Sequence, residues 1–141
     1  MKRILIGVGN RLRGDDGVGL VVAERIRSID SIQSPGASFE LMDLWDGADE
    51  VILVDAARSG ARPGTIHRLD AAEEPLPEKL LATSTHSIGL SETVELARRL
   101  GRLPGGVVVY GIEAGDLSQD EGLSPDVARA ADELVEMIDG A

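Results

Sequence analysis

The chain of 141 residues, 43% of them hydrophobic, is of a length and composition that suit one domain with one ordinary core, and we expect residues 1–141 to form a single domain. Its formal net charge of −11 repels nucleic-acid phosphates and anionic lipid headgroups, which argues against nucleic acid and membranes as partners. The sequence contains no cysteine, which excludes disulfides, thiolate metal sites and cysteine nucleophiles.

The segments that commonly direct a chain to or through a membrane are not recognisable in this sequence. The apolar run that follows Lys2 and Arg3 is too short for the core of a signal peptide. No stretch approaches the ~18 apolar residues that indicate a membrane-spanning helix. We therefore expect a cytoplasmic protein.

The predicted elements alternate between buried strands and amphipathic helices. Short apolar runs that end at glycine or a charge are typical of strands, and apolar residues at a spacing of three and four are typical of helices. In chain order these are a strand at 4–8, helices at 17–29 and 39–45, a strand at 51–54, an edge strand at 65–69, a helix at 90–100, a strand at 107–110 and a helix opened by Ser124 and Pro125. This alternation favours a parallel sheet with helices on both faces.

Polar residues follow several of the predicted strands. Asp15 and Asp16 lie in the loop after the first strand, Asp55 ends the run at 51–54, and His86 immediately precedes the helix at 90–100. Ligand sites of parallel sheets lie beyond the carboxyl ends of the strands, so these side chains could meet at one edge. Carboxylates and an imidazole suit nickel, zinc and similar ions.

Each of these residues also has a purely structural interpretation. Asp15 or Asp16 could cap the helix that follows, and a carboxylate there would interact favourably with the helix dipole. Asp55 could accept hydrogen bonds from loop amides, and His86 could be a capping or loop histidine. His67 falls in the predicted edge strand, where we expect it on the surface.

Two other enzyme classes have weak support in the sequence. The glycines of Gly7-Val8-Gly9 suggest dinucleotide binding, but the third glycine of that fingerprint is replaced by Leu12. The serines Ser84, Ser87 and Ser91 near His86 suggest a serine hydrolase, but the Gly-x-Ser-x-Gly motif is missing.

Five blocks of the sequence resemble the hydrogenase maturation proteases, in the right order and over nearly the whole chain. The first and most specific is the segment 7–19, which reads GVGNRLRGDDGVG. The others are VDA at 54–56, THSIGL at 85–90, YGIE at 110–113 and GLSP at 122–125.

The resemblance implies a three-layer α/β/α sandwich around a mostly parallel five-stranded sheet. It implies an endopeptidase of the aspartyl type that removes the C-terminal extension of a nickel-iron hydrogenase large-subunit precursor after nickel insertion. Asp16, Asp55 and His86 match the family's metal-binding and catalytic residues. The metal would be nickel supplied by the substrate, for which other divalent ions could substitute, and the family's members are often monomeric.

One region departs from the pattern of that family. The segment between Arg27 and Phe39 is short for a second strand and the turn that follows it. That strand is expected near Ser31–Ser34, if it is present, and its truncation would alter the wall of the substrate cleft. The hydrogenase served by this chain is not specified by the sequence.

The sequence leaves several points of mechanism open. A metal-bound water or one of the carboxylates could act first. Backbone N–H groups of the Gly9–Gly14 loop could face the oxyanion, and Asn10 could orient that loop or be a turn residue. Three alternatives from other classes are a nucleotide-binding domain, a non-catalytic metallochaperone or docking protein for the nickel-loaded precursor, and a metalloenzyme with its own zinc.

Overall fold

Residues 1–36, 39–77, 80, 89–117 and 122–140 are described by the computed structural model of this protein. Five strands form one sheet in the order β2-β1-β3-β5-β4. Three of the four pairings, β1–β2, β1–β3 and β3–β5, are parallel, and the edge strand β4 pairs antiparallel with β5. The strands are β1 Arg3–Val8, β2 Asp30–Ser34, β3 Glu50–Ala57, β4 Ile66–Asp70 and β5 Gly106–Glu113.

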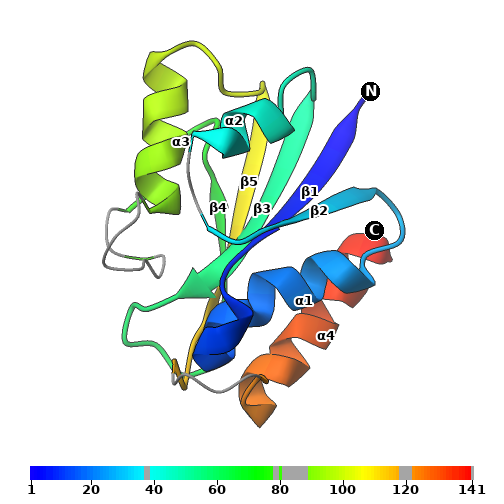
Figure 1. Ribbon diagram of the computed structural model, residues 1–141, viewed down its shortest axis with the longest axis vertical. Helices are drawn as coiled ribbons and strands as arrows, with labels where there is room; N and C mark the ends of the chain where they lie inside the picture. The colour runs from blue at the N-terminus through cyan, green and yellow to red at the C-terminus, as the bar shows by residue number, and fades with distance from the viewer. Residues whose placement is uncertain (37–38, 78–79, 81–88, 118–121, 141) are drawn as a thin grey trace.

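Helices cover both faces of the sheet (Figure 1). Their bounds are η1 Arg11–Gly17, a 3-10 segment, then α1 Val18–Arg25, α2 Glu40–Leu44, α3 Leu90–Arg99 and α4 Pro125–Asp139. Helices α1 and α4 pack side by side on one face, and α2 and α3 lie on the other (Figure 1). The expected three-layer α/β/α sandwich is confirmed.

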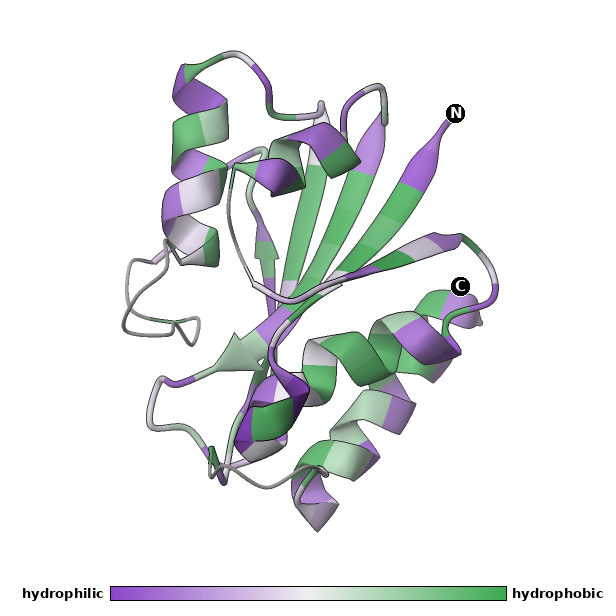
Figure 2. Ribbon diagram, viewed as in Figure 1, coloured by the Kyte–Doolittle hydropathy of each residue, from purple (hydrophilic) through white to green (hydrophobic). Residues whose placement is uncertain are grey.

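Two hydrophobic cores result from the alternation of side chains along the strands. Ile4, Ile6 and Val8 of β1 contribute to the core beneath α2 and α3, whereas Leu5 contributes to the core beneath α1 and α4. The three parallel strands β1, β3 and β5 are largely hydrophobic, whereas the helices combine hydrophilic and hydrophobic residues (Figure 2). This burial on both faces is the pattern of a central parallel strand.

Glycines let the backbone of α1 approach the sheet closely. A Cβ atom on Gly7 would lie 2.0 Å from the carbonyl oxygen of Gly19, and one on Gly19 would lie 2.3 Å from that of Val54. No side chain fits at either distance, so the turn of β1 into α1 requires both glycines. The close approach brings the residues just before α1 next to the carboxyl end of β3.

Several expected elements differ from those in the structure. The first full helix ends at Arg25 rather than near residue 29, because the chain becomes extended at Ile26 to enter β2. Strand β3 continues to Ala57, so Asp55 lies inside a strand and not after it. The second strand is present as Asp30–Ser34, so the short connection does not remove it.

The start of α4 also differs in detail from the sequence-based expectation. Ser124 occupies the N-cap position before Pro125, as predicted, but its hydroxyl does not cap the helix. It donates instead to Asp15 at 2.8 Å. In the described part of the chain, no helix is long and apolar enough to cross a membrane.

Candidate active site

The loop between β1 and α1 folds back on itself at the carboxyl end of β1. The N–H of Asn10 donates to the carbonyl oxygen of Asp16 and to its Oδ2, at 3.3 and 3.1 Å. The side chain of Asn10 accepts from the N–H of Leu12 at 2.9 Å. A Cβ atom on Gly9 would lie 2.0 Å from the carbonyl oxygen of Asp16, so only glycine permits this closure. Asn10 therefore acts as a turn residue that orients the loop.

Most N–H groups of this loop are already engaged. Those of Gly9, Asn10 and Arg13 donate to backbone carbonyls, and that of Leu12 donates to the Asn10 side chain. These donors already make hydrogen bonds within the protein. The expectation that N–H groups of the Gly9–Gly14 loop face an oxyanion therefore remains a prediction for Arg11 and Gly14.

Asp15 has a structural role that connects distant parts of the chain. Its carboxylate accepts hydrogen bonds from the N–H groups of Gly115, Asp116 and Ser124 and from the Ser124 hydroxyl, at 2.7 to 2.8 Å. The side chain is completely buried. Asp15 thus fastens the connection between β5 and α4 to the loop after β1. It does not cap α1, whose N-cap residue Gly17 makes no side-chain hydrogen bond.

Asp16 is buried next to the first loop, and few donors of the described residues approach its carboxylate. Its Oδ2 accepts from the N–H of Asn10 and lies 4.0 Å from Nη1 of Arg13. Burial raises the pKa of Asp16 above its usual value. Loss of hydration destabilises the charged carboxylate by more than Arg13 and the Asn10 N–H stabilise it.

Asp55 lies in β3 on the face covered by α2 and α3 and is 3% exposed. Its carboxylate accepts the N–H of Ala56 at 2.8 Å. Burial, and then the negative charge of nearby Asp16, raise the pKa of Asp55 well above its usual value. The two carboxylates are therefore close enough to destabilise each other's charge, and a proton or a cation between them would relieve this repulsion.

Of the three predicted site residues, Asp16 and Asp55 lie near enough for the charge of Asp16 to raise the pKa of Asp55. The predicted third member, His86, lies outside the described residues. So do Ser84 and Ser87 of the serine-hydrolase alternative, whereas Ser91 is buried and donates to the carbonyl oxygen of Pro77 at 3.1 Å. Within the described ranges, no group of three or more histidines and carboxylates could hold a metal ion. Two carboxylates are ligands of a kind that divalent ions accept, but they alone do not form a complete metal site.

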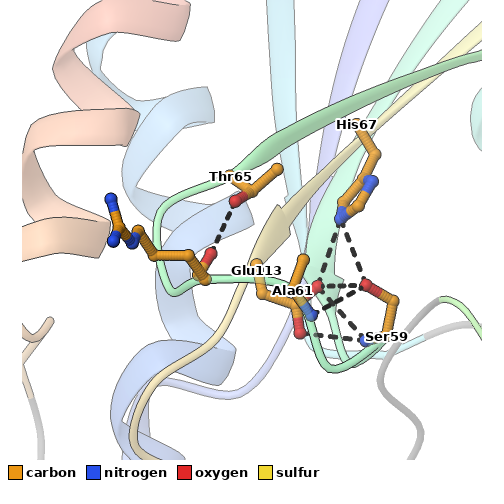
Figure 3. A network of polar contacts seen from close by, with 6 residues as sticks. Ser59, Ala61, Thr65, His67 and Glu113 are labelled. Atoms are coloured by element: carbon orange, nitrogen blue, oxygen red, sulfur yellow. Dashed lines mark hydrogen bonds and ion pairs between the residues drawn. The ribbon is translucent and has the colours of Figure 1, made fainter.

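A second polar cluster at this end of the sheet was not predicted. The carboxylate of Glu113, at the end of β5, accepts the N–H and the hydroxyl of Ser59 and lies 3.1 Å from Nε2 of His67 (Figure 3). The residue is 2% exposed. Burial opposes the charge, but hydrogen bonds from Ser59, His67 and Gly60 outweigh it and hold the pKa of Glu113 below its usual value.

His67 lies in the edge strand β4, as expected, but it is only partly exposed at the surface. Its side chain is 23% exposed and takes part in this network. The signal that could have revealed it is the pairing of β4 with β5, which sets His67 beside Gly111 and two residues from Glu113. A single sequence does not specify that pairing.

Comparison with known proteins gives consistent results. Residues 32–141 match the family model of the hydrogenase maturation proteases. A protein of Methanocaldococcus jannaschii assigned as a hydrogenase maturation protease is 32% identical, with 97% of this chain and 94% of that protein aligned. The hydrogenase 2 maturation protease of Escherichia coli is 26% identical over 98% of this chain and 88% of its own length.

Solved structures support the same relationship. The hydrogenase-maturating endopeptidase HybD of Escherichia coli superimposes with a TM-score of 0.81 at 25% identity. The superposition covers 98% of this chain and 90% of the other.

Proposed function

Because this chain belongs to the hydrogenase maturation protease family and is a peptidase, we propose that it removes the C-terminal extension of a nickel-iron hydrogenase large-subunit precursor after nickel insertion. The observation that carries the proposal is the pair Asp16 and Asp55, two carboxylates buried at the carboxyl end of the sheet, of which Asp16 helps to raise the pKa of Asp55. Such a pair is suited to a cation that arrives with the substrate.

In this proposal Asp16, Asp55 and His86 complete the coordination of the nickel that the precursor already carries. The nickel ion is part of the substrate, and its contribution is that of a Lewis acid toward water or the scissile carbonyl. Asp16 is held by the Asn10 N–H and Asp55 by the rigid strand β3. Both oxygen ligands are therefore fixed before the substrate binds, which lowers the entropic cost of docking the cleavage site beside them.

The raised pKa values of the two aspartates support a dependence on nickel loading. Without a cation, charging both buried carboxylates is unfavourable, and one of them holds a proton more readily than a solvated aspartate does. A divalent cation reverses this balance, because it stabilises both charges at once. A precursor that lacks nickel offers no such gain, so we propose that it binds weakly and is not cut.

The other partners and properties expected from the sequence form part of the same proposal. The enzyme works as a monomer in the cytoplasm, and its one macromolecular partner is the precursor. The net charge of −11 disfavours nucleic acid.

The test uses purified protein with nickel-loaded and nickel-free precursor, followed by intact-mass measurement. We expect loss of a C-terminal peptide from the loaded precursor only. Asp16→Asn, Asp55→Asn and His86→Ala should each prevent this loss. Cleavage of both precursors would rule out nickel recognition, and cleavage by all three variants would rule out the assigned site.

A further inference from the structure

The cluster of Ser59, His67 and Glu113 lies on the same face of the sheet as Asp55. Asp55 of β3 pairs with Gly111 of β5, and Gly111 pairs with His67 of β4. Residues paired across neighbouring strands project from the same face, so Asp55, Gly111 and His67 form one row. This face also carries the core beneath α2 and α3.

The middle residue of that row is glycine, so no side chain of the sheet stands between the Asp55 carboxylate and the His67 imidazole. Two strand spacings separate the backbones of Asp55 and His67, which amounts to about 10 Å. An extended peptide advances about 3.3 Å per residue, so this distance corresponds to about three residues of a bound chain. His67 is therefore placed to contact a substrate a few residues from the bond cut near Asp55.

The hydrogen bonds around His67 fix which ring nitrogen carries its proton. The ionised Glu113 carboxylate can only accept, and it lies 3.1 Å from Nε2. The Ser59 hydroxyl donates its one proton to Glu113, so at 3.5 Å from Nε2 it too can only accept. Both neighbours of Nε2 are acceptors, and in the neutral ring this leaves Nδ1 with a free lone pair.

Glu113 does not depend on His67 for its own hydrogen bonding. Its carboxylate already accepts the N–H and the hydroxyl of Ser59. The ring edge that carries Nδ1 faces away from Glu113 (Figure 3), and no described residue hydrogen-bonds to Nδ1. The hydrogen bonds of Glu113 and Ser59 therefore orient the imidazole of His67, whereas Glu113 has other donors and does not need that imidazole.

We propose that His67, oriented by Glu113, is a positioning residue that accepts a hydrogen bond at Nδ1 from a backbone N–H of the substrate, about three residues from the scissile bond. The proposal rests on the endopeptidase function given above. It assigns His67 to binding the substrate chain in register and not to the chemical step. Because the contact is made equally in the ground and transition states, its loss should raise KM and leave kcat unchanged.

Two substitutions at His67 distinguish the contributions of its two ring nitrogens. In His67→Asn the amide oxygen can occupy the place of Nδ1, whereas in His67→Gln the amide group reaches the place of Nε2. We expect His67→Gln to keep the contact with Glu113 but to raise KM for the nickel-loaded precursor about fivefold, the effect of one neutral hydrogen bond. His67→Asn should restore a KM close to that of the wild type. Arg68→Gln, an exposed neighbour on the opposite face of β4, is the matched control and should change neither constant.

A substrate change tests the same contact from the other side. Proline lacks an N–H, so we would place it in turn at the second, third and fourth positions on either side of the cleavage site in the precursor. At one position the fivefold difference between wild type and His67→Gln should disappear. Three results would each overturn the proposal. They are equal KM values for His67→Gln and wild type, a lowered kcat in both His67 variants, and effects of His67→Gln and proline on KM that add fully at every position. A wild-type enzyme that fails to cut any loaded precursor overturns the endopeptidase function first and this inference with it.

Discussion

Asp55 and Glu113 lie on adjacent strands, on the same face of the sheet and at the same end, and both are almost completely buried. Around Glu113 the protein supplies donors from Ser59, Gly60 and His67, and the pKa falls below its usual value. Around Asp55 it supplies the Ala56 N–H and the opposing charge of Asp16, and the pKa rises well above its usual value. Asp55 and Glu113 are thus similarly buried, and the number of hydrogen-bond donors around each carboxylate decides which one is stable as an anion.

The comparison indicates what each region is for. A buried carboxylate with its hydrogen bonds satisfied stabilises the fold and resists change. A buried pair of carboxylates without enough donors costs stability, and such pairs occur where a ligand completes them. Among the described residues, the Glu113 carboxylate has several donors, whereas the Asp55 carboxylate has the Ala56 N–H and the unfavourable charge of Asp16.

The largest expected effect is on activity at the aspartate pair. Asp16→Asn and Asp55→Asn should each lower kcat/KM by a factor of about a hundred to ten thousand, the range for loss of an essential group in catalysis. The free energy of unfolding at neutral pH should stay the same or rise, because each change removes an unfavourable buried charge. Mass spectrometry of the precursor and urea unfolding followed by the fluorescence of Trp45, the one tryptophan and a buried one, measure the two quantities. A variant that loses both activity and stability would mean that the aspartate stabilises the fold and has no direct part in catalysis.

The same exchange of carboxylate for amide should have the opposite effect at Glu113. Glu113→Gln leaves the Ser59 and His67 donors with a weaker acceptor and should lower the free energy of unfolding by about 2 kcal/mol. Glu24→Gln is the matched control, because Glu24 pairs with Arg11 on the exposed surface at 3.3 Å, where an ion pair contributes at most about 1 kcal/mol. Equal effects of the two variants in urea unfolding would mean that the Glu113 network contributes no more than a surface pair.

The contributions of the two regions to the free energy of unfolding should change with pH in opposite directions. With raised pKa values, folded Asp16 and Asp55 bind protons that the unfolded chain releases, so their effect on stability becomes less favourable as the pH rises above the usual value of 3.8. Glu113, with its lowered pKa, contributes stability that is present above the usual value of 4.5 and is lost as the pH falls through the lowered pKa.

Unfolding of wild type, Asp55→Asn and Glu113→Gln between pH 3 and pH 8 measures these slopes. The advantage of Asp55→Asn over wild type should grow with rising pH above the usual aspartate value. The deficit of Glu113→Gln should shrink as the pH falls below the usual glutamate value. Parallel curves for wild type and Asp55→Asn would contradict the raised pKa of Asp55.

The sequence predicted the parts of this arrangement that depend on local pattern. Apolar runs identified the three central parallel strands, and strand ends pointed to Asp16 and Asp55. What it missed depends on contacts between distant segments. Asp15 and Asp16 are adjacent and chemically identical, and only the approach of the chain at 115–124 assigns Asp15 to the scaffold. His67 likewise meets Glu113 only through the antiparallel pairing of β4 with β5, a register that neither segment encodes alone.

The smallest expected effect concerns a free divalent cation and the enzyme without its substrate. With Asp16 and Asp55 charged, added Ni²⁺ should bind weakly and raise the melting temperature, by about 3 °C at ten times its dissociation constant. The shift should be smaller at pH 5 than at pH 8, since protons compete for carboxylates whose pKa values are raised. Differential scanning calorimetry measures it. Glu113→Gln should melt at a lower temperature yet show the same nickel-induced shift, whereas the double variant Asp16→Asn/Asp55→Asn should show none. A shift that survives in the double variant would place the cation elsewhere, and one that disappears in Glu113→Gln would mean that the two carboxylate regions act as one site.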